Sequence, residues 1–307
     1  MNSKTKSWFL LILLAIIWGS SFILMNKAMF IDNNKDYPLL TANEVGGLRI
    51  LISGFVLLFV FFRHIKTAFS KHTIFLILVG ILGNFGPALL FTHAQQTLSS
   101  SLTGILNSLV PIFSVIVATL VFKHKISTKA IGGILIGLVG TVFLIYFSNN
   151  GNGDIELIPV LMVVSATVCY AFSLNIIKNK LTEVSSFAIT SISLVFMIIP
   201  SLITLGFTDV IDKVSNPIYY PAIGYTALLA VVGTAIALVI FNELIKLTTS
   251  VFASSVTYLI PVVAILWGLY FNEPISWGIS FATLIIVGVV IVKKEEQKRA
   301  ELEKNNS

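Results

Sequence analysis

Long apolar runs alternate with short polar breaks along the whole chain, and each run has about the length of a membrane-spanning helix. A hydrocarbon core of ~30 Å requires about 20 apolar residues per helix, and backbone groups in lipid must pair within the protein. The alternating pattern of a membrane β-barrel is absent. The pattern therefore predicts an all-α integral membrane protein with ten transmembrane helices, at about 7–27, 42–62, 73–94, 99–121, 129–147, 156–177, 185–205, 219–241, 249–271 and 276–293.

One sequence pattern occurs twice, 150 residues apart. The turn-rich residues 148–154 separate the copies, so we expect a first half at 1–150, a second half at 151–293 and a charged tail at 294–307. Each half holds five spans, an odd number, so the second must enter the membrane upside down relative to the first. Five positions align without a gap: Gly83, Phe91, Ser100, Leu109 and Pro111 with Gly233, Phe241, Ser250, Leu259 and Pro261.

Composition supports the membrane assignment, because 56% of the residues are hydrophobic and only 11% are charged, against roughly 25% charged in soluble domains. The net charge of +6 follows from the placement of Lys and Arg. With the N-terminus in the cytoplasm, the outer loops receive only Lys35 and Lys213. We therefore expect both termini in the cytoplasm, the lipid bilayer as a partner, and no nucleic acid. Cys169 is the only cysteine, so no disulfide or thiolate metal site is expected.

Several local motifs resemble the drug/metabolite transporter superfamily, and within it the EamA-type permeases of bacterial inner membranes. They are Trp18-Gly-Ser-Ser21, Leu48-Arg49, the spans with Pro111 and Pro261, and Asn272-Glu273-Pro274-Ile275-Ser276. The resemblance covers nearly the whole chain. It implies ten helices in two inverted five-helix repeats. It also implies a central cavity lined by spans 1, 3, 4, 6, 8 and 9, and the export of amino acids, metabolites or drugs.

Two positions depart from that family's pattern. His124 stands in the first half where the second half has Glu273, so we interpret Glu273 as a helix-start or loop contact rather than a substrate ligand. Tyr170 stands in span 6 where a tryptophan equivalent to Trp18 is often found.

Polar residues recur at helical spacing in spans 4 and 9. Pro111 and Pro261 each remove a backbone hydrogen bond and free the carbonyls of Asn107 and Thr257. These groups suit a substrate ammonium or hydroxyl; alternatively, small polar residues let helices pack closely, with interhelical hydrogen bonds of about 0.6–2 kcal/mol. The candidate substrate-binding residues here are Thr103, Asn107, Ser254 and Thr257.

Trp18, Ser21, Tyr170 and Ser173 occupy matching places in spans 1 and 6, and we count them as further substrate-binding candidates. Aromatic rings inside a bundle can stack on flat substrates or attract a cationic amine. Ordinary packing is the alternative, since the chain holds 23 phenylalanines.

Three ionisable residues need an explanation, because charge inside a bilayer is costly. Arg49 can bind a substrate carboxylate or a proton's counter-charge, or it can clamp carbonyls or Glu44 within the bundle. His93 and Glu243 occupy the same repeat position but should lie near opposite membrane faces, which suggests proton-linked gating. Interfacial solvation is the alternative, with Glu243 paired to Lys246.

These features predict a secondary transporter, an exporter of small organic metabolites such as amino acids, amines or drug-like compounds, working by alternating access. The chain has no nucleotide-binding Gly-x-x-x-x-Gly-Lys-Ser/Thr loop, so substrate or proton gradients should drive it. A membrane-embedded enzyme and a passive channel are the alternatives, but no catalytic constellation, cofactor motif or filter-like segment occurs.

The spacing Gly133-xxx-Gly137 allows two helices to approach closely. It serves either the contact between halves or a homodimer.

Overall fold

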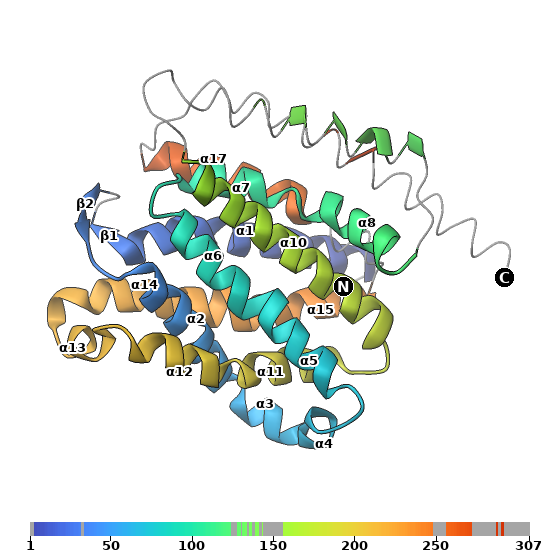
Figure 1. The fold of residues 1–307 in the computed structure, drawn as a ribbon, viewed down its shortest axis with the longest axis horizontal. Coiled ribbons are helices and arrows are strands. Elements are labelled where there is room, and N and C mark those ends of the chain that lie inside the picture. The colour runs from blue at the N-terminus through green and yellow to red at the C-terminus, as the bar shows by residue number, and fades with distance from the viewer. Residues whose placement is uncertain are drawn as a thin grey trace, which may run out of the picture.

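The computed structural model describes residues 3–31, 34–123, 156–247 and 256–271, together with runs of one to three residues between 128 and 143 and between 287 and 291. Nearly all of the described chain is helical (Figure 1). The first half contains α1 (Ser3–Met29), α2 (Ala42–Val56), α3 (Leu58–Arg63), α4 (Ile65–Ala68), α5 (Thr73–Gly80), the π-helix η1 (Ile81–Phe85), α6 (Gly86–Ala94), α7 (Ser100–Asn107) and α8 (Val110–Leu120). The second contains α10 (Leu157–Lys180), α11 (Ser186–Phe196), α12 (Ile198–Gly206), α13 (Val210–Val214), the 3₁₀-helix η2 (Pro217–Tyr219), α14 (Tyr220–Ala230), the π-helix η3 (Val231–Ile236), α15 (Ala237–Leu247) and α17 (Val256–Tyr270).

Six helical stretches in the described ranges are long and apolar enough to cross a membrane, and each matches a predicted span. Their ends differ from the predicted ends by three residues or fewer. Span 42–62 is α2 and α3, interrupted at Leu57. Span 249–271 is described from residue 256 onward, and spans 129–147 and 276–293 lie mostly outside the described residues. The six stretches are Thr5–Met29, Thr73–Ala94, Ser100–Leu120, Leu157–Lys180, Ser186–Gly206 and Pro217–Leu244.

A short hairpin follows α1, in the break between the predicted spans 7–27 and 42–62. Its strands β1 (Phe30–Ile31) and β2 (Asn34–Pro38) pair antiparallel, with Phe30 opposite Pro38. The Leu39 amide then donates to the Met29 carbonyl at 2.7 Å, which brings the start of α2 back to the end of α1. The protein is therefore mostly helical, with one small sheet that the all-α prediction did not contain.

The two π-helices occupy repeat-related positions, since Ile81 and Val231, their first residues, are 150 residues apart. Each contains the glycine that the sequence repeat aligned, Gly83 in η1 and Gly233 in η3. Pro87 gives η1 a local cause, because proline cannot donate to the carbonyl of Gly83 four residues earlier. Such π-helical segments occur frequently at functional sites.

The first helix of each half packs mainly against the other half. In the first half, α1 contacts α14, α15 and α17; in the second, α10 contacts α5, α6 and α8. Between them, α2 contacts both α11 and α12. Figure 1 shows the hairpin and α13 together at one end of the bundle, which we call the hairpin end. The start of α1 lies at the other end, the amino-terminal end.

Candidate functional site

The π-helix η3 brings together side chains from two helices of the first half. Trp18 of α1 donates its indole N–H to the Gly233 carbonyl at 3.2 Å. Arg49 of α2 donates from Nε to the Thr234 hydroxyl at 2.8 Å. Two predicted site residues, far apart in the sequence, therefore meet at adjacent residues of one irregular segment.

Ser21 and Ser173 cover the glycines of the two π-helices. A Cβ atom placed on Gly233 would lie 3.0 Å from Ser21 Oγ, and one placed on Gly83 would overlap Ser173 Oγ. Both serines are buried, and Ser21 donates to the Ile17 carbonyl of its own helix at 3.0 Å. In this structure both serines therefore occupy close helix–helix contacts, as the packing alternative proposed.

Two aromatic pairs occupy equivalent positions in the halves. Trp18 packs on Phe241, with ring centroids 5.1 Å apart, and Tyr170 stacks on Phe91, with centroids 5.9 Å apart. Phe91 and Phe241 are themselves related by the 150-residue repeat. Trp18 and Tyr170 are both half-buried.

Arg49 lies among neutral groups. Besides the Thr234 hydroxyl, its guanidinium contacts the Met25 thioether, with Nη1 4.0 Å from the sulfur. The phenol of Tyr170 lies within electrostatic reach of the guanidinium. Among the described residues Arg49 has no carboxylate partner, so the interpretation that it clamps Glu44 is wrong.

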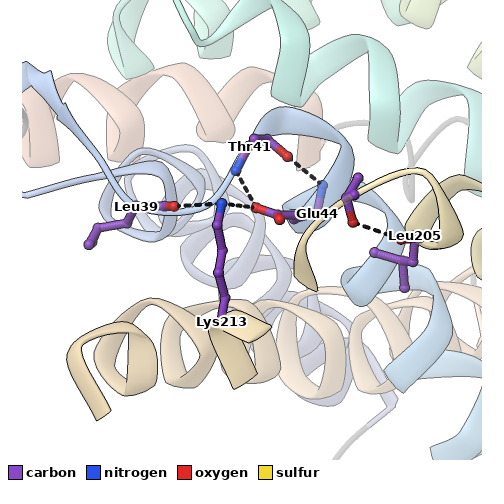
Figure 2. Close-up of polar contacts among 6 residues, drawn as sticks. Leu39, Thr41, Glu44, Leu205 and Lys213 are labelled. Carbon is purple, nitrogen blue, oxygen red and sulfur yellow. Dashed lines mark hydrogen bonds and ion pairs between the residues drawn. The ribbon is translucent and has the colours of Figure 1, made fainter. Parts of the chain in front are cut away.

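Glu44 instead pairs with Lys213 of α13, as Figure 2 shows. The Lys213 ammonium lies 2.7 Å from Glu44 Oε2 and also donates to the Leu39 carbonyl at 3.1 Å. Thr41 and Glu44 form a reciprocal capping box at the start of α2. The motif Thr41-x-x-Glu44 was visible in the sequence, but nothing local pointed to Lys213, 169 residues away.

The two candidate residues of span 4, Thr103 and Asn107, differ in their hydrogen bonds. Thr103 is fully buried and donates to the Ser99 carbonyl of its own helix at 2.8 Å, so its hydroxyl is used within α7. Asn107, the last residue of α7, is 9% exposed, and its amide has no hydrogen-bond partner within the described part of the chain. Thr257 of α17 is buried to the same extent, whereas Ser254 lies outside the described residues.

His93 and Glu243 lie at opposite ends of the bundle. His93 shares a 2.9 Å hydrogen bond with Asn43 at the hairpin end. Glu243 pairs with Lys6 of α1 at 3.5 Å, at the amino-terminal end, with both side chains partly exposed. The side chain of Lys246, the partner suggested by the sequence, lies outside the described residues.

Comparison with known proteins gives a consistent set of relatives. The model of the EamA-like transporter family matches this chain twice, at residues 5–146 and 157–293. An S-adenosylmethionine/S-adenosylhomocysteine transporter of Chlamydia muridarum is 25% identical over 304 residues, covering 94% of this chain and 92% of that one. The inner membrane transporter YedA of Escherichia coli K12, whose own function is uncharacterized, is 26% identical over 289 residues, covering 91% and 88%. A Salmonella typhimurium protein named "Probable amino-acid metabolite efflux pump" is 26% identical over 180 residues, covering 58% and 55%.

Proposed function

Because this multi-pass membrane protein belongs to the EamA-like transporter family, we propose that it is a secondary transporter that exports small amino-acid-like metabolites across a bacterial inner membrane by alternating access. The observation that carries this proposal is the pair of repeat-related π-helices, each covered by the first helix of the other half. Beside them lie two half-buried aromatic residues, Trp18 at η3 and Tyr170 on Phe91 of α6.

Two features support an arrangement of inverted halves. The packing is reciprocal, because α1 contacts elements of the second half and α10 contacts the matching elements of the first. His93 and Glu243 share a repeat position but lie at opposite ends of the bundle. A repeat inverted in the membrane would produce both relations, and it would allow the halves to rock around a shared midplane site.

The substrate class and the direction of transport are supported by the relatives. One is named for S-adenosylmethionine and S-adenosylhomocysteine, and another for efflux of amino-acid metabolites. We propose outward transport, with both termini in the cytoplasm, driven by the substrate gradient or by protons. Proton coupling would involve His93 and Glu243, which lie at the two ends where gates would open.

The proposal is tested with purified protein in liposomes. Vesicles are preloaded with unlabelled S-adenosylhomocysteine or methionine, and uptake of the labelled compound is followed. A carrier gives counterflow, a transient accumulation of label above equilibrium, whereas a channel gives only equilibration. The variant with Lys71→Gln and Glu183→Gln removes an exposed ion pair and serves as the matched control with unchanged counterflow.

Direction is tested in cells. Overexpression should raise the exported compound in the medium, and deletion should raise it inside the cell. Mass spectrometry of both compartments measures this, and it also detects chemical conversion. Chemical conversion of the compound without its movement across the membrane would favour the membrane-embedded enzyme. Flux of the compound into liposomes without counterflow would favour the passive channel.

A further inference from the structure

We propose that Arg49 and Tyr170 form an anion site inside the bundle that binds the carboxylate of the transported metabolite. The inference rests on the proposed function, because it assigns the bound carboxylate to the substrate. It adds a specific recognition group and a chemical class: a monocarboxylate, carried by an amino acid or an amino-acid derivative.

The hydrogen-bonding capacity of Arg49 is largely unused. A guanidinium has five N–H donors and no acceptor. In the described part of the chain, Nε has the Thr234 hydroxyl and Nη1 has only the Met25 sulfur at 4.0 Å. Nη2 has no partner there, and Arg49 as a whole is only half-buried. An anion could therefore reach it.

Within the described part of the chain, Arg49 also has no carboxylate counter-ion. Glu44, the nearest acidic residue along α2, is held by Lys213, and the other described ion pairs join Lys6 to Glu243 and Lys71 or His72 to Glu183. A charged group inside a membrane protein normally has a counter-charge, because removing it from water is costly. A substrate carboxylate would supply that counter-charge in the loaded carrier.

The accessible surface of Arg49 faces the interior of the bundle. The Arg49 guanidinium contacts the buried side chains of Met25 in α1 and Thr234 in η3, and the half-buried Tyr170 stacks on the buried ring of Phe91 in α6. We infer that the exposed parts of Arg49 and Tyr170 open between helices of the bundle rather than toward lipid. Arg49 comes from α2 in the first half and Tyr170 from α10 in the second, so the site spans both halves.

Carboxylate is the anion that best fits this pair. The planar guanidinium binds a carboxylate through two parallel hydrogen bonds, and the phenol O–H can donate a third. A phosphate dianion would require more positive charge, but Arg49 is the one cationic residue of its helix α2. The rings of Trp18 and Tyr170 remain partly accessible and can attract the substrate's cationic amine.

The test compares carboxylates with their amides. Methionine and phenylalanine, each beside its carboxamide, and S-adenosylhomocysteine are added to the full-length detergent-purified protein, and thermal stabilisation gives an apparent affinity. The wild type should bind the carboxylates about 10–100-fold more tightly than the amides. Arg49→Gln should bind both forms equally. Arg63→Gln removes an exposed arginine that lies over Phe59, and it should keep the preference.

Two outcomes would overturn the inference: a wild type with no preference for carboxylates, or a preference that persists in Arg49→Gln. If Arg49→Gln does not fold, Arg49→Lys decides, because lysine keeps the charge but lacks the planar fork. Its preference should fall several-fold, and an unchanged preference counts against the site. A purely structural role of Arg49 would lower stability without altering the ratio of carboxylate to amide affinity.

The two proposals can be contradicted independently of each other. Carboxylate binding that depends on Arg49, without counterflow, would support the anion site and contradict the proposed transport. Counterflow of both carboxylates and amides, unaffected by Arg49→Gln, would keep the transporter and remove the anion site.

Discussion

The ion pair between Glu44 and Lys213 joins the two halves at the hairpin end. The Glu44 side chain is 1% exposed and that of Lys213 is 17% exposed, so the pair lies in a largely dry environment. Removing one partner of such a pair leaves an uncompensated charge, which costs more than the pair itself contributes. The contact therefore acts mainly as a constraint on how the halves can separate there.

Replacement of Glu44 by glutamine should lower the free energy of unfolding by about 1–3 kcal/mol. This is less than the roughly 3–5 kcal/mol for a fully buried pair, because Lys213 can turn partly toward water. Glutamine preserves the capping box with Thr41, so the change isolates the charge. Thermal unfolding in detergent measures the loss.

The double variant Glu44→Gln with Lys213→Met provides the internal comparison, because it removes both charges. It should be more stable than Glu44→Gln alone. Glu183→Gln, in an ion pair that is mostly exposed, should leave stability unchanged. Equal losses in the single and double variants would show that the unpaired charge of Lys213 is not the cause of the loss.

At the residue scale, the sequence identified candidate site residues but not the contacts that they make. Arg49 was identified because charge inside a bilayer is costly, and Trp18 and Tyr170 because they occupy matching places in spans 1 and 6. Arg49, which the sequence suggested as one possible partner of Glu44, was wrong. Glu44 pairs with Lys213, which is distant along the chain, so no local spacing indicates the contact. The Trp18 bond to the Gly233 carbonyl was also missed, since it depends on the backbone of a π-helix.

At the element scale, the aligned glycines have different tolerance for a side chain. At Gly83 a Cβ would overlap Ser173 Oγ, whereas at Gly233 the nearest atoms, Leu229 Cδ1 and Ser21 Oγ, lie 3.0 Å away. The η1 contact is therefore the tighter of the two.

The variant Gly83→Ala should lose about 1–3 kcal/mol of stability through overpacking. Gly233→Ala should lose less, because the neighbouring side-chain ends can shift. Combining Gly83→Ala with Ser173→Ala should recover only part of the loss, since Ser173 Cβ would remain 3.1 Å away. Thermal unfolding midpoints rank these proteins.

Gly224 supplies the matched control, because a Cβ there would meet nothing within 4 Å. Gly224→Ala in α14 should be neutral or slightly stabilising, as alanine favours helix. A loss at Gly224 equal to that at Gly83 would show that close packing is not the cause.

The sequence predicted the elements themselves well, and their irregularities poorly. The repeat aligned Gly83 with Gly233 but gave no reason to expect π-helices, and η3 has no proline to mark it. The interruptions at Leu57 and Met197 were also missed. The interruption at Met197 has a local cause that the sequence did carry, because Pro200 cannot donate to the Phe196 carbonyl four residues earlier. Leu57 and η3 have no proline beside them, and hydrophobic periodicity does not report such deviations.

At the scale of the whole molecule, the reciprocal packing of α1 and α10 makes a prediction about sidedness. If the halves are inverted, the ends of spans 4 and 6 must emerge on the same side. Lys123, after α8, and Lys178, near the end of α10, mark those ends and are both exposed. Ile211 of α13, 79% exposed, marks the opposite side.

Cysteine labelling checks this in a Cys169→Ala background, which removes the chain's only cysteine. A membrane-impermeant maleimide on intact cells should label Ile211→Cys, whereas Lys123→Cys and Lys178→Cys should react only in inverted vesicles. The Cys169→Ala parent should give no signal. Labelling of Lys123→Cys and Lys178→Cys from different sides would exclude inverted halves.

Among the described residues, no ion pair in the second half is equivalent to the one between Glu44 and Lys213. At the equivalent start of α11, Ser185 caps the helix as Thr41 caps α2, but Ala188 stands where Glu44 would be. Two identical halves would leave an empty carrier with equal populations facing each side. The ion pair between Glu44 and Lys213 stabilises one of these two orientations over the other. The proposed carrier, when empty, should therefore rest with its hairpin end closed. Such a bias sets the relative speed of the two return steps and leaves the equilibrium point of transport unchanged.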